Sequence, residues 1–182
     1  KGMVSSYGDM TSVAVSPDGT RLAVAIQSAN YDDKGSVALF ACQDDGSLKP
    51  LSTVKVGVQP DMLTFADGST ILTADEGEQR QGVDGTDPKG SVTIVTIDPD
   101  TAKMTVKSVY FDAFDAQRDA LTAAGVLIQK DTQPSTDFEP EYIAVSGRTA
   151  YVALQEANAI AVLDIDKAQF TGVYPLGFQD YS

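Results

Sequence analysis

The chain has 182 residues, 42% of them hydrophobic, which is enough for one domain with a sizeable core. With 13 basic and 26 acidic residues its net charge is −13, which argues against a nucleic-acid or anionic-membrane surface, because both need patches of Lys and Arg. The chain contains no histidine, which excludes catalytic triads and zinc sites built on imidazole, and its single cysteine, Cys42, excludes an internal disulfide. No stretch is long and apolar enough to cross a membrane.

One sequence unit occurs three times along the chain. Each copy is an alternating apolar run, a turn that contains Gly, and a second alternating run that ends at Ala25, Ala74 or Ala153. Period-2 alternation predicts strands, and the turn predicts a hairpin. A β-meander repeated at this scale is typical of propeller blades, so the sequence predicts an all-β fold of about three four-stranded antiparallel blades.

The spacing of the repeats separates the blades from one insertion. The terminal alanines are 49 and then 79 residues apart. The first spacing suits one four-stranded blade, and the second exceeds it by about 30 residues. We therefore expect the following segments: blade one at 9–57, blade two at 58–111, a helical insertion at 112–138, blade three at 139–176 and the start of a next blade at 177–182. The expected strands lie near 11–16, 21–27, 36–42 and 50–56, near 62–66, 70–74, 91–97 and 103–110, and near 142–146, 149–154, 159–164 and 169–174.

The insertion has the pattern of a helix that packs on a blade edge. Asp112 is a candidate N-cap, and the glycine at 125 suits the end of the helix. Phe114 and Leu121 are seven residues apart and therefore share one helix face. The segment 130–137, rich in Ser, Thr and Asp, is predicted to be a loop. The Asp-Gly turns at 18–19 and 67–68 are predicted to have a structural role only, with glycine at positive φ.

Acidic residues occur in several loops that propeller geometry places on the same face of the molecule, at a rim around the central channel. The segment before the first strand of a blade and the loop between its second and third strands meet at the same face. The candidate metal ligands on this rim are Asp75, Glu76, Glu78, Glu139, Glu141 and Glu156. Carboxylate oxygens that converge in this way suit a hard cation, and Ca²⁺ is the candidate cofactor. The competing interpretation is that the acidic loops are merely solvated, or that Glu139 and Glu141 cap backbone N–H groups between blades.

Several runs resemble the choice-of-anchor I domain family. They are 58–65, 72–78, 87–92, 137–145, 151–156, 158–161 and 176–182, in order over nearly the whole chain. Members resemble secreted or surface-attached bacterial β-propellers of the YncE-like kind and are often labelled alkaline phosphatase-like. The resemblance implies a secreted, periplasmic or cell-surface location and a seven-bladed propeller of which this chain, which begins at Lys1 without Met, is a processed or excised piece.

Three functions fit these observations. The first is an extracellular binding or scaffold module whose acidic rim binds a divalent cation, a glycan or a cell-surface protein. The second is a metal-dependent phosphoesterase of which this chain is a fragment. Only Lys34, Arg80 and Lys89 are basic residues near the rim that could bind a phosphate group. The third is a purely structural propeller. Three blades leave two open sheet edges with unpaired strand groups, which we expect to pair with the remaining blades or with another copy. No catalytic residue, nucleic-acid partner or membrane insertion is expected.

Overall fold

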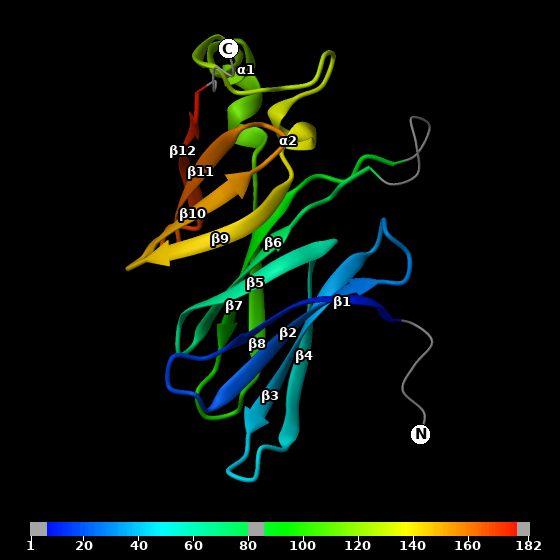
Figure 1. The fold of residues 1–182 in the computed structure, drawn as a ribbon, viewed down its shortest axis with the longest axis vertical. Helices are drawn as coiled ribbons and strands as arrows, with labels where there is room; N and C mark the ends of the chain where they lie inside the picture. Colours follow the sequence, from blue (N-terminus) through cyan, green and yellow to red (C-terminus); the bar gives the residue numbers. More distant parts are fainter. Residues whose placement is uncertain (1–6, 80–85, 178–182) are drawn as a thin grey trace, which may run out of the picture.

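Three four-stranded antiparallel sheets make up the fold in the computed structural model, which describes residues 7–79 and 86–177 (Figure 1). In each sheet the strands are paired in the order in which they occur along the chain. Blade one contains β1 (Tyr7–Val15), β2 (Arg21–Ser28), β3 (Lys34–Cys42) and β4 (Leu48–Val58). Blade two contains β5 (Pro60–Asp67), β6 (Thr70–Asp75), β7 (Ser91–Ile97) and β8 (Met104–Tyr110). Blade three contains β9 (Pro140–Ser146), β10 (Thr149–Leu154), β11 (Ala159–Asp164) and β12 (Gln169–Pro175). The predicted all-β fold of three blades is confirmed. The expected start of a next blade falls mostly on 178–182, outside the described residues.

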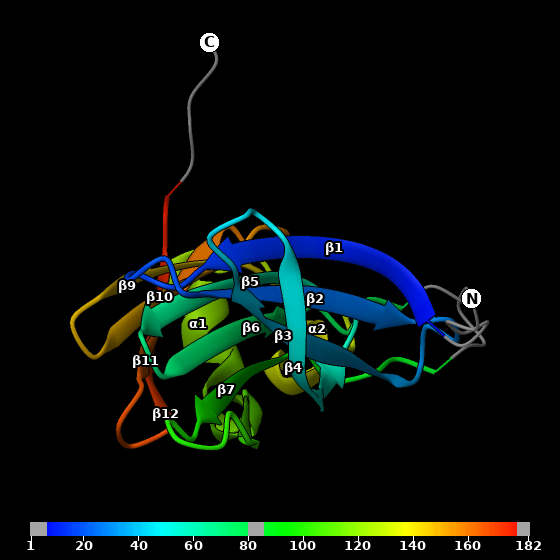
Figure 2. The same ribbon diagram turned by 90° about the horizontal axis from the view of Figure 1, so that it is seen from below.

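The first strands of the three blades lie next to one another. β5 contacts β1 on one side and β9 on the other, and all three run along the same side of the molecule (Figures 1 and 2). The later strands of each sheet follow outward from this side, as in the blades of a propeller. The segments that lead into β5 and β9 therefore reach the same rim, which is the arrangement assumed for the candidate site.

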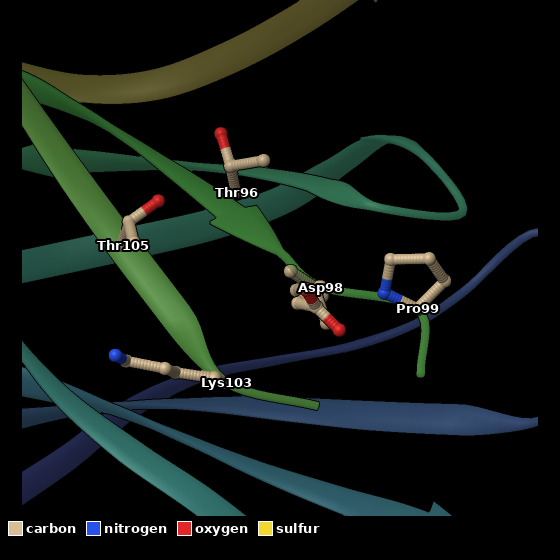
Figure 3. Close-up of a pocket in the computed structure, with 6 residues that line it drawn as sticks. Thr96, Asp98, Pro99, Lys103 and Thr105 are labelled. Atoms are coloured by element: carbon tan, nitrogen blue, oxygen red, sulfur yellow. The ribbon is translucent and has the colours of Figure 1, made fainter. Parts of the chain in front are cut away.

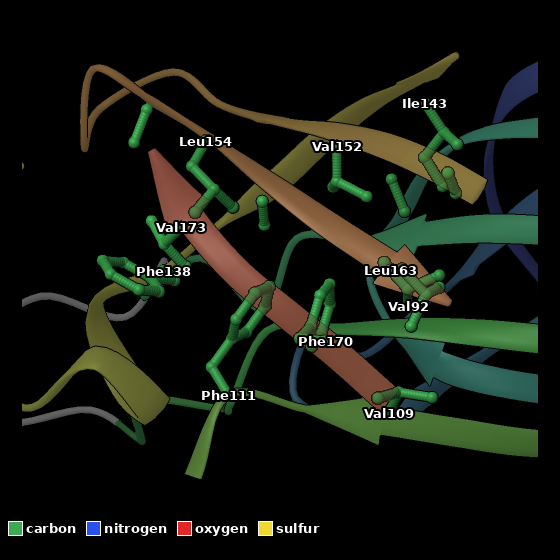
Figure 4. Close-up of a cluster of buried hydrophobic side chains, with 14 of the residues drawn as sticks. Val92, Val109, Phe111, Phe138, Ile143, Val152, Leu154, Leu163, Phe170 and Val173 are labelled. Carbon is green, nitrogen blue, oxygen red and sulfur yellow. The ribbon is translucent and has the colours of Figure 1, made fainter. Parts of the chain in front are cut away.

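Sheet faces pack against each other through two apolar clusters, one at each junction between blades. Ala25, Val37 and Leu39 of blade one pack with Leu63 and Ile71 of blade two. The larger cluster joins blades two and three and includes four phenylalanine rings (Figure 4). The ring of Phe111 stacks on that of Phe170 with centroids 4.2 Å apart and meets the ring of Phe138 edge-on at 5.4 Å.

The insertion between blades two and three is helical and agrees only in part with the sequence. A 3₁₀ helix (Asp112–Gln117) continues into α1 (Arg118–Ala124), which ends at Gly125 with φ of 106°, as predicted. Phe114 and Leu121 are buried in the core between blades two and three, as predicted. Asp112 does not cap the helix; the cap position is Phe111, and no side chain caps it.

The segment expected to be a loop contains a second short helix, α2 (Pro134–Asp137). Proline is favoured at the first turn of a helix, where its missing N–H has no partner to lose. The carboxylate of Asp115 accepts hydrogen bonds from the backbone N–H and the hydroxyl of Ser135, at 2.8 and 2.9 Å. A long-range contact from Asp115 thus supplies the acceptor for the start of α2, which local composition does not reveal.

The turns behave as the sequence predicts at one position and not at the other. Gly19 has φ of 73°, a backbone conformation that favours glycine, whereas Gly68 does not have positive φ. Asp18 accepts hydrogen bonds from Ser16 and Thr20, which hold its pKa at about 2. These turns lie at the ends of the strands opposite to the rim.

In residues 7–79 and 86–177 no helix has the length and apolar character needed to cross a membrane.

Candidate functional site

Two close contacts tie the loop after β6 to the beginnings of β5 and β9. The N–H of Glu76 donates to the carbonyl of Gln59 at 3.0 Å. On the other side, a Cβ added to Gly90 would come within 2.1 Å of the Phe138 carbonyl oxygen and 3.0 Å of the Glu76 carbonyl oxygen. Glycine is therefore required at 90, because it lets the loop of blade two reach the backbone beside Glu139.

A buried glutamine organises the loops of blades one and two at the same rim. Gln59 lies between β4 and β5, is 1% exposed and has φ of 52°. Its side-chain amide donates to the Glu78 carbonyl at 2.7 Å and to the Tyr31 carbonyl at 3.3 Å. The sequence marks Gln59 only as a neighbour of Pro60, so its role as a link between loops emerges from the structure.

Carboxylates from blades two and three act on one another at this rim. Glu139 precedes β9, Glu141 is the second residue of β9, and Glu156 lies in the turn between β10 and β11. Burial, followed by the charges of Glu156, Glu76 and Glu78, raises the pKa of Glu139 to about 7. Burial also raises the pKa of Glu141 to about 7, together with a hydrogen bond to Glu156 and the charges of Glu156 and Glu76. Glu141 and Glu156 thus lie within hydrogen-bonding reach of each other.

The structure brings together five of the six predicted ligands but not Asp75. The carboxylate of Asp75 is fully buried inside blade two. It accepts hydrogen bonds from the hydroxyls of Thr73 at 2.7 Å, Ser91 at 2.9 Å and Thr93 at 2.6 Å. Burial raises the pKa of Asp75 to about 6. These three hydrogen bonds, and one from the N–H of Gly57, each lower the pKa but do not offset the effect of burial. Asp75 therefore belongs to a buried polar cluster between blades one and two.

These hydroxyl partners were missed by the sequence analysis although the sequence carries their signal. The β6–β7 register pairs Thr73 with Thr93 and Asp75 with Ser91. Polar residues thus occupy adjacent positions on one face of two strands that are otherwise apolar. Buried polar groups require hydrogen-bond partners, and such a cross-strand group provides them.

The rim carboxylates are not arranged as a finished metal site. Among the described residues, no group of three or more acidic, His or Cys side chains has a geometry that could hold a metal ion. Asp61 and Asp137 add negative charge beside Glu141 and Glu139 respectively. Binding a cation here would require that Glu139 and Glu141 be deprotonated and that the glutamates converge.

Lys89 and Asn158, a polar residue in the turn between β10 and β11, make contacts of their own. Lys89 forms an ion pair with Asp112 at the start of the insertion, and Arg80 lies outside the described residues. The side-chain amide of Asn158 donates to the Gly177 carbonyl at 2.8 Å, so it supports the chain after β12. The charges that surround Glu139 and Glu141 are therefore acidic.

A separate hollow of about 370 Å³ lies at the opposite end of blade two (Figure 3). It is lined by Thr96, Ile97, Asp98, Pro99, Lys103 and Thr105 around the β7–β8 turn. Asp98 accepts hydrogen bonds from the N–H groups of Asp100 and Thr101, which close that turn. This hollow is therefore part of a turn and shares no residue with the rim.

The whole arrangement is that of a partial β-propeller. A model of the choice-of-anchor I domain matches residues 2–182, and the chain belongs to this family. A comparison with curated proteins yields no match.

Solved propeller structures resemble the chain in fold. A putative 6-phosphogluconolactonase from Bacteroides fragilis superposes with a TM-score of 0.62 at 18% identity, over 92% of this chain and 44% of that protein. The β-propeller domain of Cps50 (Swd1) from Myceliophteria thermophila superposes with a TM-score of 0.57 at 8% identity, over 94% of this chain and 45% of that one. The chain thus spans less than half the length of these propellers, and at such low identity the likeness shows the fold alone.

Proposed function

We propose that the chain is a binding or scaffold module of a secreted or surface-attached protein, and that its acidic rim binds a cationic ligand, with Ca²⁺ as the first candidate. The observation that carries this proposal is the mutual repulsion of Glu76, Glu139, Glu141 and Glu156 at one place. Like charges held together and partly buried are unfavourable without a counter-charge. A divalent cation with oxygen ligands would relieve this repulsion.

The family supports the surface location in this proposal, because choice-of-anchor domains resemble secreted or surface-attached propellers. A rim that displays carboxylates also suits a basic segment of a cell-surface protein. A phosphate ester is a poorer ligand, since its negative charge would meet Glu139 and Glu141 and would require a cationic cradle. No described contact favours the phosphoesterase alternative.

Thermal unfolding with and without Ca²⁺ or Mg²⁺ tests the cation proposal. The measurement belongs at pH 8, because metal ligation requires deprotonated carboxylates and releases their protons. At a Ca²⁺ concentration about 100 times the dissociation constant, ligation adds about 2.7 kcal/mol, which raises the Tm by roughly 5 °C or more.

Paired variants locate the effect. Glu139→Gln and Glu141→Gln are expected to abolish the rise in Tm. Asp44→Asn removes one charge from an exposed turn between β3 and β4, far from the rim along the strand, and is expected to retain the rise. A Tm that does not move at millimolar Ca²⁺ or Mg²⁺ contradicts the cation proposal, as does a rise that survives both glutamine variants.

A further inference from the structure

Gln59 combines two unfavourable features at the junction of blades one and two. Its φ of 52° lies in the left-handed region, which is unfavourable for a side chain such as glutamine. Among the largest fully buried side chains of residues 7–79 and 86–177, Gln59 is the one polar member. A buried amide is unfavourable unless its polar atoms are hydrogen-bonded. Since a glycine at this position would avoid both penalties, the contacts of the glutamine side chain must offset them.

The amide of Gln59 serves loops from two different blades. Both of its hydrogen bonds come from Nε2, one to the carbonyl of Glu78 at 2.7 Å and one to the carbonyl of Tyr31 at 3.3 Å. Glu78 lies in the loop after β6, and Tyr31 lies in the loop between β2 and β3. A side-chain NH₂ group has two N–H donors, so both are used. Gln59 thus links the second-to-third loops of blades one and two across the rim.

Backbone hydrogen bonds hold the first part of the loop after β6 beside Gln59. We call this part, residues 76–78, the acidic loop. The N–H of its first residue donates to the Gln59 carbonyl at 3.0 Å, and the N–H of Gly77 donates to the Val58 carbonyl at 3.3 Å. The amide of Gln59 binds the carbonyl of its last residue. Each residue of the acidic loop is therefore bonded to the segment that connects blade one to blade two.

The position equivalent to Gln59 in blade three is Glu139. Pro60 and Pro140 each pair with the last residue of the second strand in their own blade. The residues that precede these two prolines therefore correspond. One position thus carries a neutral amide at the junction of blades one and two and a carboxyl group at the junction of blades two and three.

Glu139 cannot take over the linking role of Gln59 when it is ionised. The acidic loop lies near Glu139, since the charges of Glu76 and Glu78 act on it. An ionised carboxylate has no donor to offer to the carbonyl groups of that loop. The distance between the acidic loop and Glu139 is therefore set from the side of blade one, where Gln59 binds the loop, together with the backbone approach at Gly90.

We propose that Gln59 is the positioning residue of the rim: its amide fixes the acidic loop to blade one and thereby holds Glu76 and Glu78 toward Glu139. A strained, buried residue of this kind persists only where its surroundings hold it, and such residues cluster at ligand clamps. The proposal deepens the cation-binding function proposed above, and its ligand measurement rests on that function. Its contacts lie within blades one and two and do not depend on what covers the ends of the stack.

Hydrogen exchange of backbone amides, followed by NMR on the intact chain, tests the positioning without any ligand. Gln59→Met keeps most of the volume but removes both donors, whereas Gln59→Gly also relieves the backbone and so keeps the test available if methionine disturbs folding. In both variants the N–H groups of Glu76 and Gly77 are expected to exchange at least 10-fold faster, while those of β10 in blade three keep their wild-type rates. Gln117→Met is the matched control, because it removes an exposed glutamine amide that donates to the Ala113 carbonyl at 3.3 Å. It is expected to change none of these rates.

Calcium affinity separates positioning from a general effect on stability. Calorimetric titration with Ca²⁺ at pH 8 is expected to give a dissociation constant at least 10-fold higher for both Gln59 variants than for wild type, and an unchanged one for Gln117→Met. If the wild type binds no Ca²⁺, the function proposed for the rim fails, and the exchange rates alone decide the positioning.

Three results would overturn the role of Gln59. The first is exchange at Glu76 and Gly77 that is as slow in the variants as in wild type. The second is exchange that accelerates equally in β10, which would make Gln59 a general support of the fold. The third is a wild-type chain that binds Ca²⁺ and variants that bind it with the same dissociation constant.

Discussion

The carboxylate of Asp75 in blade two occupies the space that a side chain at Gly57 of blade one would fill. A Cβ added to Gly57 would come within 2.4 Å of Oδ2 and 2.5 Å of Cγ of Asp75. The N–H of Gly57 also donates to this carboxylate. The outer strand of one blade thus both makes room for the buried acid of the next and gives it a hydrogen bond, which couples the polar cluster to the junction between the blades.

Gly57→Ala is expected to destabilise the chain by about 1–3 kcal/mol, because the added methyl group must displace a fully bonded buried carboxylate. Gly68→Ala is the matched control, since a Cβ at 68 meets no atom within 4 Å. Urea unfolding at one fixed protein concentration measures both. Equal urea midpoints for the two variants would show that the junction between blades one and two accommodates a methyl group at position 57 without loss of stability.

Asp75→Asn is expected to flatten the dependence of stability on pH. The pKa of Asp75 is raised from 3.8 to about 6 in the folded chain. Its contribution is therefore fully present below pH 3.8 and is lost as the pH rises through about 6, by up to about 3 kcal/mol. Since Asn cannot titrate, the free energy of unfolding of the variant relative to wild type should rise between pH 4 and pH 7. Asp100→Asn, in an exposed turn, is expected to keep the wild-type profile. Asp75→Ala, which leaves the hydroxyls of Thr73, Ser91 and Thr93 without their acceptor, should cost about 3 kcal/mol or more near pH 4 and less as the pH rises through about 6.

Double substitution of Glu139→Gln and Glu141→Gln is expected to stabilise the chain in alkaline solution. The pKa values of both groups are raised from 4.5 to about 7, so their contribution is present below pH 4.5 and is lost as the pH rises through about 7. The variant should therefore have a higher Tm than wild type at pH 8 and a similar Tm at pH 4.5. Both side chains are partly exposed, so added salt should reduce the difference. Asp119→Asn, on an exposed helix position, serves as the control for loss of charge. A Tm difference that does not change between pH 4.5 and pH 8 would contradict the repulsion inferred for the rim.

The sequence predicts the strands because apolar residues alternate with others along several of them and because the same hairpin unit occurs in each blade. It places Asp75 wrongly with respect to its neighbours for a specific reason. β6 was expected to end at Ala74, whereas the structure extends it to Asp75. One further strand residue turns the side chain from the rim onto the face of the sheet beside Thr73, where Ser91 and Thr93 provide partners.

The raised pKa values of Glu139 and Glu141 could be predicted from the sequence only in part. Their position follows from the order of strands in a blade, which the repeats reveal. The burial of Glu139 depends on the close approach of Gly90 to Phe138, and this approach joins segments that lie almost 50 residues apart. The same limit applies to α2, which depends on Asp115. Local patterns thus specify the blades, while contacts between loops of different blades determine the electrostatics of the rim.

Phe111→Ala is expected to cost about 3–5 kcal/mol, the usual loss for a large buried aromatic side chain. Phe111 follows β8 and is fully buried where its ring meets Phe170 of blade three and Phe138 of the insertion. The substitution therefore leaves a cavity at the place where blade two, blade three and the insertion join, while Phe111→Leu should cost less because it retains most of the volume. Leu127→Ala, at an exposed apolar position of the insertion, is expected to change stability by less than about 0.5 kcal/mol. Urea unfolding followed by circular dichroism measures these differences. If Phe111→Ala cost less than about 1 kcal/mol, the aromatic cluster would not be what holds the insertion against the two blades.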